Sequence, residues 1–154
     1  MKFGKILLTS LLLSAAAFAN VTDSQGTWNG SGIAYDGNGA QAGTFTVSVV
    51  NQATSNNQVD SQITVTEQDG TVLKMNDVLV DDGNGAFSQD MDGAKGGGRC
   101  FANGICESYV SGSDGHAYAT TIVLDGSDQE RIFINELQGG KATGFVSEKL
   151  ARVK

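Results

Sequence analysis

Two cysteines have the spacing that points most directly to chemistry. Cys100 and Cys106 enclose the five residues Phe-Ala-Asn-Gly-Ile, so a hairpin centred on Asn103 would place them opposite each other. Gly104 suits the left-handed position on which a three-residue hairpin loop ends. The spacing differs from a CxxC redox centre, and a zinc site would need partners that are not nearby in the sequence. We therefore predict a Cys100–Cys106 disulfide, which fits an oxidising compartment.

The remaining reactive residue types form no recognisable catalytic or metal-binding pattern. His116 is the only histidine and follows the turn signal Asp114-Gly115, where we expect a solvated turn residue. It has no free cysteine partner for a metal site, and no GxSxG nucleophile motif accompanies it. The acidic clusters at 81–85 and 90–93 lack the spacing of an EF-hand loop. We expect no enzyme activity, no metal and no cofactor.

A glycine-rich stretch with two cations precedes the first cysteine. Residues 93–99 read Gly-Ala-Lys-Gly-Gly-Gly-Arg, but neither the GxxxxGK[ST] pattern nor a helix start follows to cradle a phosphate. We interpret the stretch as a mobile loop that leads into the disulfide hairpin. Because loops on a rigid scaffold often carry function, this loop and the hairpin 100–106 form our candidate recognition surface.

The N-terminus has the pattern of a secretory signal. Lys2 and Lys5 precede an apolar run over 6–18, and Ala17-Phe18-Ala19 supplies a small-x-small cleavage pattern. The run is shorter than the roughly 20 residues needed to span a bilayer. We predict a signal peptide at 1–19, cleavage after Ala19, and a periplasmic or secreted product with no membrane span in its mature form.

Length and charge limit the domain number and the binding partners of the mature product. Removing 1–19 would leave a single domain at 20–154 and change the net charge from −7 to −9, because Lys2 and Lys5 would leave with the signal. An acidic chain lacks the basic surface that nucleic acid binding requires. The charge is suited to attracting a cationic partner.

Hydrophobic residues after the signal alternate with a period of two, which is typical of antiparallel strands with one buried face. Turn signals such as Asp36-Gly37, Asp69-Gly70 and Asp125-Gly126 recur every eight to ten residues. The pattern changes phase near Asn76-Asp77, where we expect a one-residue bulge. Residues 147–154 suit a helix or a final strand. We predict an all-β antiparallel meander of about eight or nine strands, closed into a barrel because closure removes exposed edges; a β-sandwich is the alternative.

The first predicted strand carries the most specific local motif. Residues 26–32 read Gly-Thr-Trp-Asn-Gly-Ser-Gly, and this GxWxGxG resembles the start of lipocalins and related calycin barrels such as the nitrobindins. The resemblance implies a lipocalin-like barrel in which Trp28 closes one end and packs against a late arginine, Arg152 or failing that Arg131, by a cation–π contact. The second and third lipocalin motifs and the haem-ligand context of the nitrobindins are not legible.

Two functions remain open from the sequence. The first is an exported binding protein that holds a small apolar or amphipathic ligand inside the barrel. The second is an interaction or inhibitor protein that uses its loops on a basic protein partner. For the first function the candidate lining residues are Phe45, Val47, Val49, Ile63, Val65, Tyr118, Ile122, Ile132 and Ile134.

Overall fold

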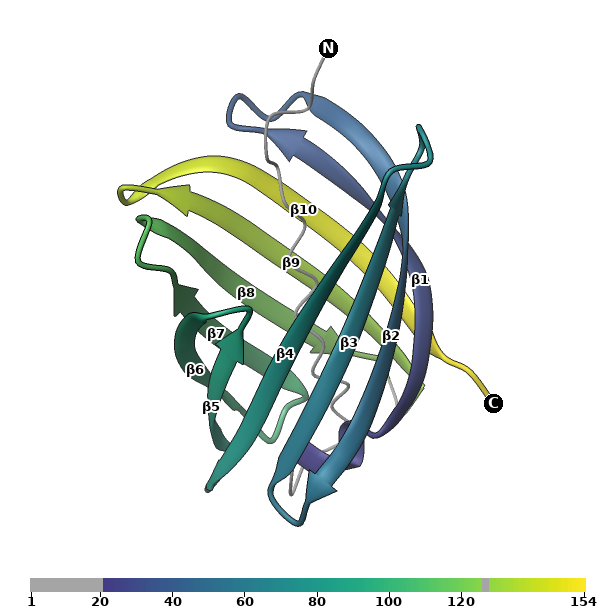
Figure 1. Cartoon of the computed structure of the whole chain (residues 1–154), viewed down its shortest axis with the longest axis vertical. Coiled ribbons are helices and arrows are strands. Elements are labelled where there is room, and N and C mark those ends of the chain that lie inside the picture. The colour runs from purple at the N-terminus through teal and green to yellow at the C-terminus, as the bar shows by residue number, and fades with distance from the viewer. Residues whose placement is uncertain (1–20, 126–127) are drawn as a thin grey trace.

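The structure, a computed structural model, describes residues 21–125 and 128–154. The predicted signal peptide at 1–19 and its cleavage site lie outside the described residues. One short 3-10 helix and ten strands follow along the described chain (Figure 1). Their bounds are η1 Val21–Ser24, β1 Gly26–Asp36, β2 Gln41–Ser55, β3 Gln58–Glu67, β4 Val72–Gly83, β5 Ala86–Met91, β6 Ala94–Cys100, β7 Ile105–Ser111, β8 His116–Leu124, β9 Gln129–Gln138 and β10 Lys141–Arg152.

The ten strands form a closed antiparallel barrel. Each strand pairs with its neighbours in sequence, and β1 pairs with β10 to close the ring. Short turns join the strands, so the connections leave no room for parallel crossovers. The prediction of an all-β meander closed into a barrel is confirmed, and the β-sandwich alternative is not adopted. The strand number is slightly higher than the eight or nine expected.

The additional strand is the glycine-rich stretch, so the expectation of a mobile loop at 93–99 is wrong. β6 pairs along its whole length with β5 and β7. A Cβ atom at Gly96 would collide with the carbonyl oxygen of Tyr109, and one at Gly98 with that of Glu107. Glycine here reflects the close approach of neighbouring backbones in a tightly packed part of the wall.

The expected bulge at Asn76-Asp77 is also absent. β3 and β4 pair without a register shift from Val72 to Val80, so β4 keeps one phase over this range. The inward side chains of β4 are therefore Met75, Asp77 and Leu79, all buried. The apparent change of phase arises because one inward position holds an acid instead of an apolar residue. The C-terminal stretch, for which helix and strand were both open, forms the second half of β10 up to Arg152.

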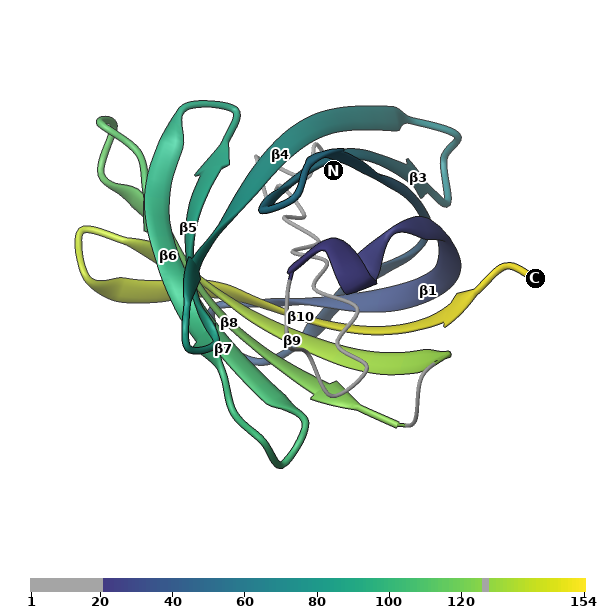
Figure 2. The same cartoon turned by 90° about the horizontal axis from the view of Figure 1, so that it is seen from below.

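The two ends of the barrel differ. The helix η1 lies across the end at which β1 begins, as the view along the barrel shows (Figure 2), and it contacts β2, β3 and β4. We call this the closed end. The turns at 92–93, 112–115 and 139–140 lie at the opposite end, which we call the open end.

Candidate functional site: the barrel interior

The inner wall is mainly apolar. Directly paired residues of antiparallel strands point to the same side of the sheet, and the register therefore places the predicted lining residues together on the inside. Eight of them are buried and Tyr118 is half-buried. Contact of these residues with a ligand stays a prediction; the inward-facing set is Phe45, Val47, Val49, Ile63, Val65, Tyr118, Ile122, Ile132 and Ile134.

Trp28 and Arg152 build the closed end. The two residues are paired across β1 and β10, and the Arg152 guanidinium carbon lies 4.7 Å from the centroid of the Trp28 ring. Trp28 Nε1 donates a hydrogen bond of 3.1 Å to the carbonyl of Ser24, and Arg152 donates one of 2.9 Å to the carbonyl of Asp23. Both side chains thereby hold η1 across the end of the barrel.

Two buried glutamates lie on the inner wall close to this end. Glu130 on β9 has no exposed surface and Glu148 on β10 has 2%. Glu130 is opposite Leu150, and Glu148 is opposite Ile132, so the two acids are diagonal neighbours. None of their four carboxyl oxygens has a hydrogen-bond partner among the described residues.

Burial dominates the electrostatics of this pair. Desolvation raises the pKa of Glu148 to about 8. Desolvation also raises the pKa of Glu130 to about 8, the neighbouring Glu148 raises it further, and Arg152 opposes the rise. Both groups therefore favour the neutral, protonated form near neutral pH.

Sequence reasoning missed both glutamates, although a signal for them existed. Glu148 alternates in phase with Val146 and Leu150, and Glu130 alternates in phase with Ile132 and Ile134. A search restricted to apolar positions passes over them. Only the structure shows that both positions lie in the interior and beside each other.

A third buried acid lies on the opposite wall. Asp77 on β4 is 1% exposed and accepts a hydrogen bond of 2.8 Å from Gln89 Nε2 on β5. Desolvation raises the pKa of Asp77 to about 7, while the Gln89 hydrogen bond lowers it and Asp90 and Asp92 raise it. Unlike the glutamates, this acid has a protein partner.

The open end holds a pocket of about 420 Å³. The inner-wall side chains Met75, Met91 and Tyr118 line its apolar part, and Asp92, Asp114 and His116 line its rim. A volume of this size is in the range of small-molecule sites. The pocket therefore forms a mouth at the open end, where these inner-wall side chains lie beside acidic groups.

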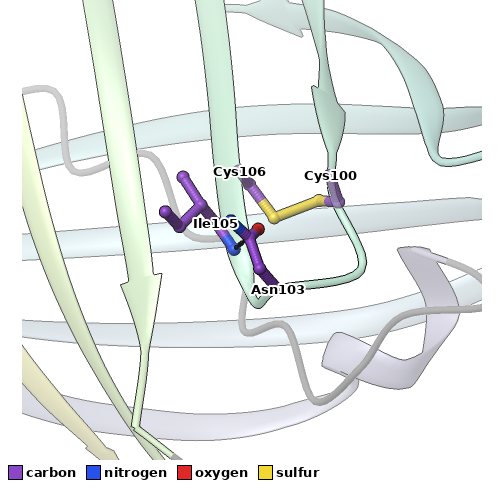
Figure 3. The surroundings of a disulfide bond; sticks show 4 residues. All are labelled: Cys100, Asn103, Ile105 and Cys106. Carbon is purple, nitrogen blue, oxygen red and sulfur yellow. Dashed lines mark hydrogen bonds between the residues drawn. A yellow bond between two sulfur atoms is a disulfide. The ribbon is translucent and has the colours of Figure 1, made fainter.

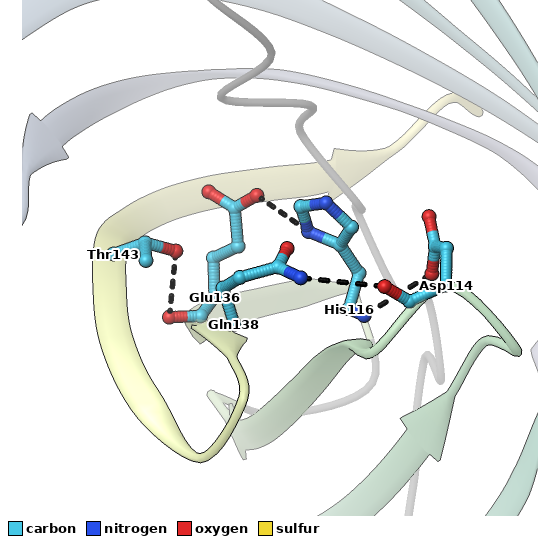
Figure 4. Close-up of polar contacts among 5 residues, drawn as sticks. All are labelled: Asp114, His116, Glu136, Gln138 and Thr143. Carbon is cyan, nitrogen blue, oxygen red and sulfur yellow. Dashed lines mark hydrogen bonds and ion pairs between the residues drawn. The ribbon is translucent and has the colours of Figure 1, made fainter.

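His116 pairs with an acid at this mouth and is not a fully solvated turn residue. Its Nδ1 lies 3.5 Å from Glu136 Oε1 on β9, and 31% of its side chain is exposed (Figure 4). Its backbone N–H donates to Asp114 Oδ1, as a turn position requires. Desolvation raises the pKa of Glu136, and His116 and Thr143 oppose this. The contact joins the start of β8 to the end of β9 at the rim. A hydrogen bond from the Thr143 hydroxyl to the Glu136 carbonyl connects β10 to the same place.

A second depression lies on the outer wall. This groove of about 680 Å³ crosses β9, β10, β1, β2 and β3. Outward-facing residues such as Ser31, Ile33 and Thr44 line most of it. Among the predicted lining residues Phe45 alone contributes to it, and Glu148 contributes to it as well.

The predicted disulfide is confirmed. Cys100 and Cys106 are bonded and directly paired at the end of the β6–β7 hairpin (Figure 3). Gly104 has a φ of 79°, the left-handed conformation expected of it. Asn103 Oδ1 accepts a hydrogen bond of 3.3 Å from the Ile105 N–H. The hairpin lies at the closed end, away from the pocket.

Comparisons with known proteins agree on the fold. No family model and no curated protein matches the chain. Among solved structures, the chain is similar to the S-type phycobiliprotein lyase CPES from Guillardia theta, with 12% identity, a TM-score of 0.68, and coverage of 86% of this chain and 89% of that one. It is also similar to Rv2717c from M. tuberculosis, with 14% identity, a TM-score of 0.68 and coverage of 91% and 99%.

A third similar structure is a protein of unknown function from the DUF3598 family of Nostoc punctiforme, with 11% identity, a TM-score of 0.67, and coverage of 95% of this chain and 54% of that one. These neighbours are antiparallel barrels of the lipocalin or calycin kind. At such low identities the likeness shows the fold alone.

Two absences concern residues 21–125 and 128–154, the part of the chain that the structure describes. In this part of the chain no group of three or more His, Cys, Asp or Glu residues is arranged to hold a metal ion. The same part contains no helix with the length and apolar character needed to cross a bilayer.

Proposed function

We propose that this chain is an exported, non-enzymatic binding protein that holds a small apolar or amphipathic ligand inside its barrel. The observation that carries the proposal is the asymmetry of the barrel. An apolar inner wall extends from an end closed by η1 and Trp28 to an open end with a pocket of about 420 Å³. A ligand would enter at Met75, Met91 and Tyr118 and lie against the apolar wall.

Two further features support binding over catalysis. The ion pair of the single histidine is with Glu136 at the rim, an acid and not a nucleophile. One structural neighbour, a designed barrel with 14% identity and a TM-score of 0.52, is described as bound to the small molecule DFHBI. A barrel of this general shape is thus compatible with a small-molecule ligand.

Native mass spectrometry of the protein purified from its own compartment tests the proposal. We expect a mass above that of the polypeptide, together with a compound recoverable by solvent extraction. Protein unfolded in denaturant and refolded without extract is the control and should show the bare mass. A bare polypeptide mass before extraction, with no extractable compound, would count against a stored ligand.

The second function, recognition of a basic protein through the loops, has one observation in its favour. Phe101 in the disulfide hairpin is 46% exposed and Tyr109 on the outer face of β7 is 50% exposed, on a chain of net charge −7. We expect any such partner to be captured by the immobilised protein at low salt and released at high salt. Capture that is lost in a Phe101→Ala, Tyr109→Ala variant would support this function, and capture that is unaffected by both changes would refute it.

A further inference from the structure

The glutamate pair Glu130–Glu148 carries an energetic cost that the fold does not explain. A buried carboxyl group without a hydrogen-bond partner is expensive, and apolar residues at the same positions would avoid the cost. Neither acid contacts a described basic group within ion-pair distance, and none of the four oxygens accepts a hydrogen bond from a described residue. Groups of this kind are concentrated at functional sites.

The pair faces the barrel interior among mainly apolar neighbours. Glu148 lies between Ile132 on β9 and Gly32 on β1, and Glu130 lies between Leu124 on β8 and Leu150 on β10. The carboxyl groups are therefore polar positions on an inner wall that is mainly apolar. Such isolated polar groups are the usual means by which an apolar pocket orients and selects a ligand.

The numbers of donors and acceptors indicate which ligand group fits. Two carboxyl groups present four oxygens and, at most, two protons of their own. A ligand that brings N–H donors would use the surplus of acceptors, and a positive charge would offset the desolvation of a carboxylate. A ligand carboxylate would instead add a third acid to two buried ones.

The neighbouring arginine does not reverse this preference. Arg152 lies over the Trp28 ring and donates from one Nη to the Asp23 carbonyl, and its buried Nε has no hydrogen-bond partner among the described residues. It lies beyond ion-pair distance of both glutamates. The open end is acidic as well, because Asp92 and Asp114 line the pocket there. The glutamate pair and the open-end pocket are thus both suited to a cation.

We propose that the barrel selects an apolar molecule that carries one basic nitrogen, and that Glu130 and Glu148 together bind this nitrogen as an ammonium group. The inference rests on the proposed function, because it assumes that the interior takes a ligand. It adds the chemical class of that ligand and the two residues that recognise it.

Binding of an ammonium group requires at least one carboxylate. A carboxyl group that is protonated in the free protein passes its proton to the solvent as the ammonium enters, so that the charges of the pair and the ligand balance. The other charged or titratable groups along the inner wall and the rim of the open-end pocket are Asp36, Glu67, Asp77, Asp81, Asp92, Asp114, His116, Tyr118, Glu136 and Arg152. Of these, Arg152 is the one that acts directly on the pair.

A displacement experiment with three matched amphiphiles tests the proposal. The uncharged dye N-phenyl-1-naphthylamine is bound in the barrel, and decylamine, decanol and decanoate are titrated as competitors at pH 7. We expect decylamine to displace the dye about tenfold more strongly than decanol, which corresponds to about 1.4 kcal/mol, and decanoate to be the weakest. Glu130→Gln and Glu148→Gln should each reduce the preference for decylamine over decanol to less than about threefold.

Glu107→Gln is the matched control, because Glu107 is exposed on the outer face of β7 and the charge change is the same. It should keep the full preference. Thermal melting of each variant verifies folding. Independently of any variant, calorimetry of the wild-type protein in two buffers of different ionisation enthalpy should show proton release with decylamine and none with decanol.

The outcomes separate the two proposals. Two results would overturn the role of the glutamates and leave the ligand-binding barrel standing. The first is dye binding with equal displacement by decylamine and decanol. The second is a preference for decylamine that remains in both glutamine variants. No binding of the dye or of any amphiphile, by displacement or by calorimetry, would overturn both.

Discussion

Among single residues, the buried acids set how stability depends on pH. Desolvation raises the pKa of Glu130 and Glu148 from 4.5 to about 8 and that of Asp77 from 3.8 to about 7. In the unfolded chain the same groups ionise at their ordinary values. The glutamates therefore stay protonated in the folded chain at pH values above about 4.5, where they lose their protons in the unfolded chain.

We predict that the free energy of unfolding falls between pH 5 and pH 8.5. The contribution of these acids is fully present below the unfolded pKa and is lost as the pH rises through the folded pKa. Urea unfolding at the two pH values should show a loss of at least about 2 kcal/mol, since each unit of pKa shift is about 1.4 kcal/mol. The double variant Glu130→Gln, Glu148→Gln should flatten this dependence, whereas Glu107→Gln should not. A wild-type stability that is equal at both pH values would contradict the burial of these acids.

Residue-scale prediction from the sequence succeeds where a side chain has a strong local signature. The disulfide follows from the spacing of Cys100 and Cys106 around Asn103, and Gly104 adopts the conformation that this hairpin demands. Glu130, Glu148 and Asp77 have only a weak local signature, their alternation in phase with apolar residues, because an acid by itself looks like an ordinary surface residue. Their importance depends on what the other strands place opposite them.

For single elements, β6 shows the limit of strand propensity. Glycine is depleted in strands in general, and a run of three predicts a loop. In this barrel the neighbouring backbones of β5 and β7 approach so closely that side chains would collide at Gly96 and Gly98. Tertiary packing therefore selects glycine where local preference disfavours it.

We predict that Gly96→Ala destabilises the protein by about 3 kcal/mol, because the added Cβ would meet backbone atoms of Tyr109 and Val110 that cannot rotate away. Chemical unfolding measures the loss. The control is Gly37→Ala, whose Cβ would lie 3.3 Å from its nearest neighbour, the carbonyl oxygen of Thr143, and which should cost less than about 1 kcal/mol. Equal stabilities of the two variants would show that β6 is not packed as described.

The alternation of side chains in β4 also differs from what its sequence suggests. The sequence suggests a bulge because Leu73 and Met75 fall on one parity and Val78 and Val80 on the other. The strand stays regular, and Asp77 takes the inward position instead. A pattern search that assumes apolar interiors converts a buried acid into a false irregularity.

For the whole molecule, the barrel could be predicted from features that do not depend on any single residue. Regular turn signals and period-two alternation require neighbouring strands to pair, and closure removes the two edges that such a meander would expose. The motif at 26–32 adds the orientation, since Trp28 lies at the closed end under Arg152. The proposed ligand class could not be predicted, because it depends on which inward side chains the register of the β9–β10 hairpin places side by side.

Closure between β1 and β10 also has a kinetic consequence. The Arg152–Asp23 hydrogen bond spans 129 positions of the chain, and β1 completes its second ladder only when β10 arrives. Contacts between such distant segments slow folding, because a long loop must be ordered before they form. Until then β1 and β10 remain unpaired edges open to other chains. The protein should therefore be most vulnerable to aggregation during its synthesis and refolding, and protected once the ring is complete.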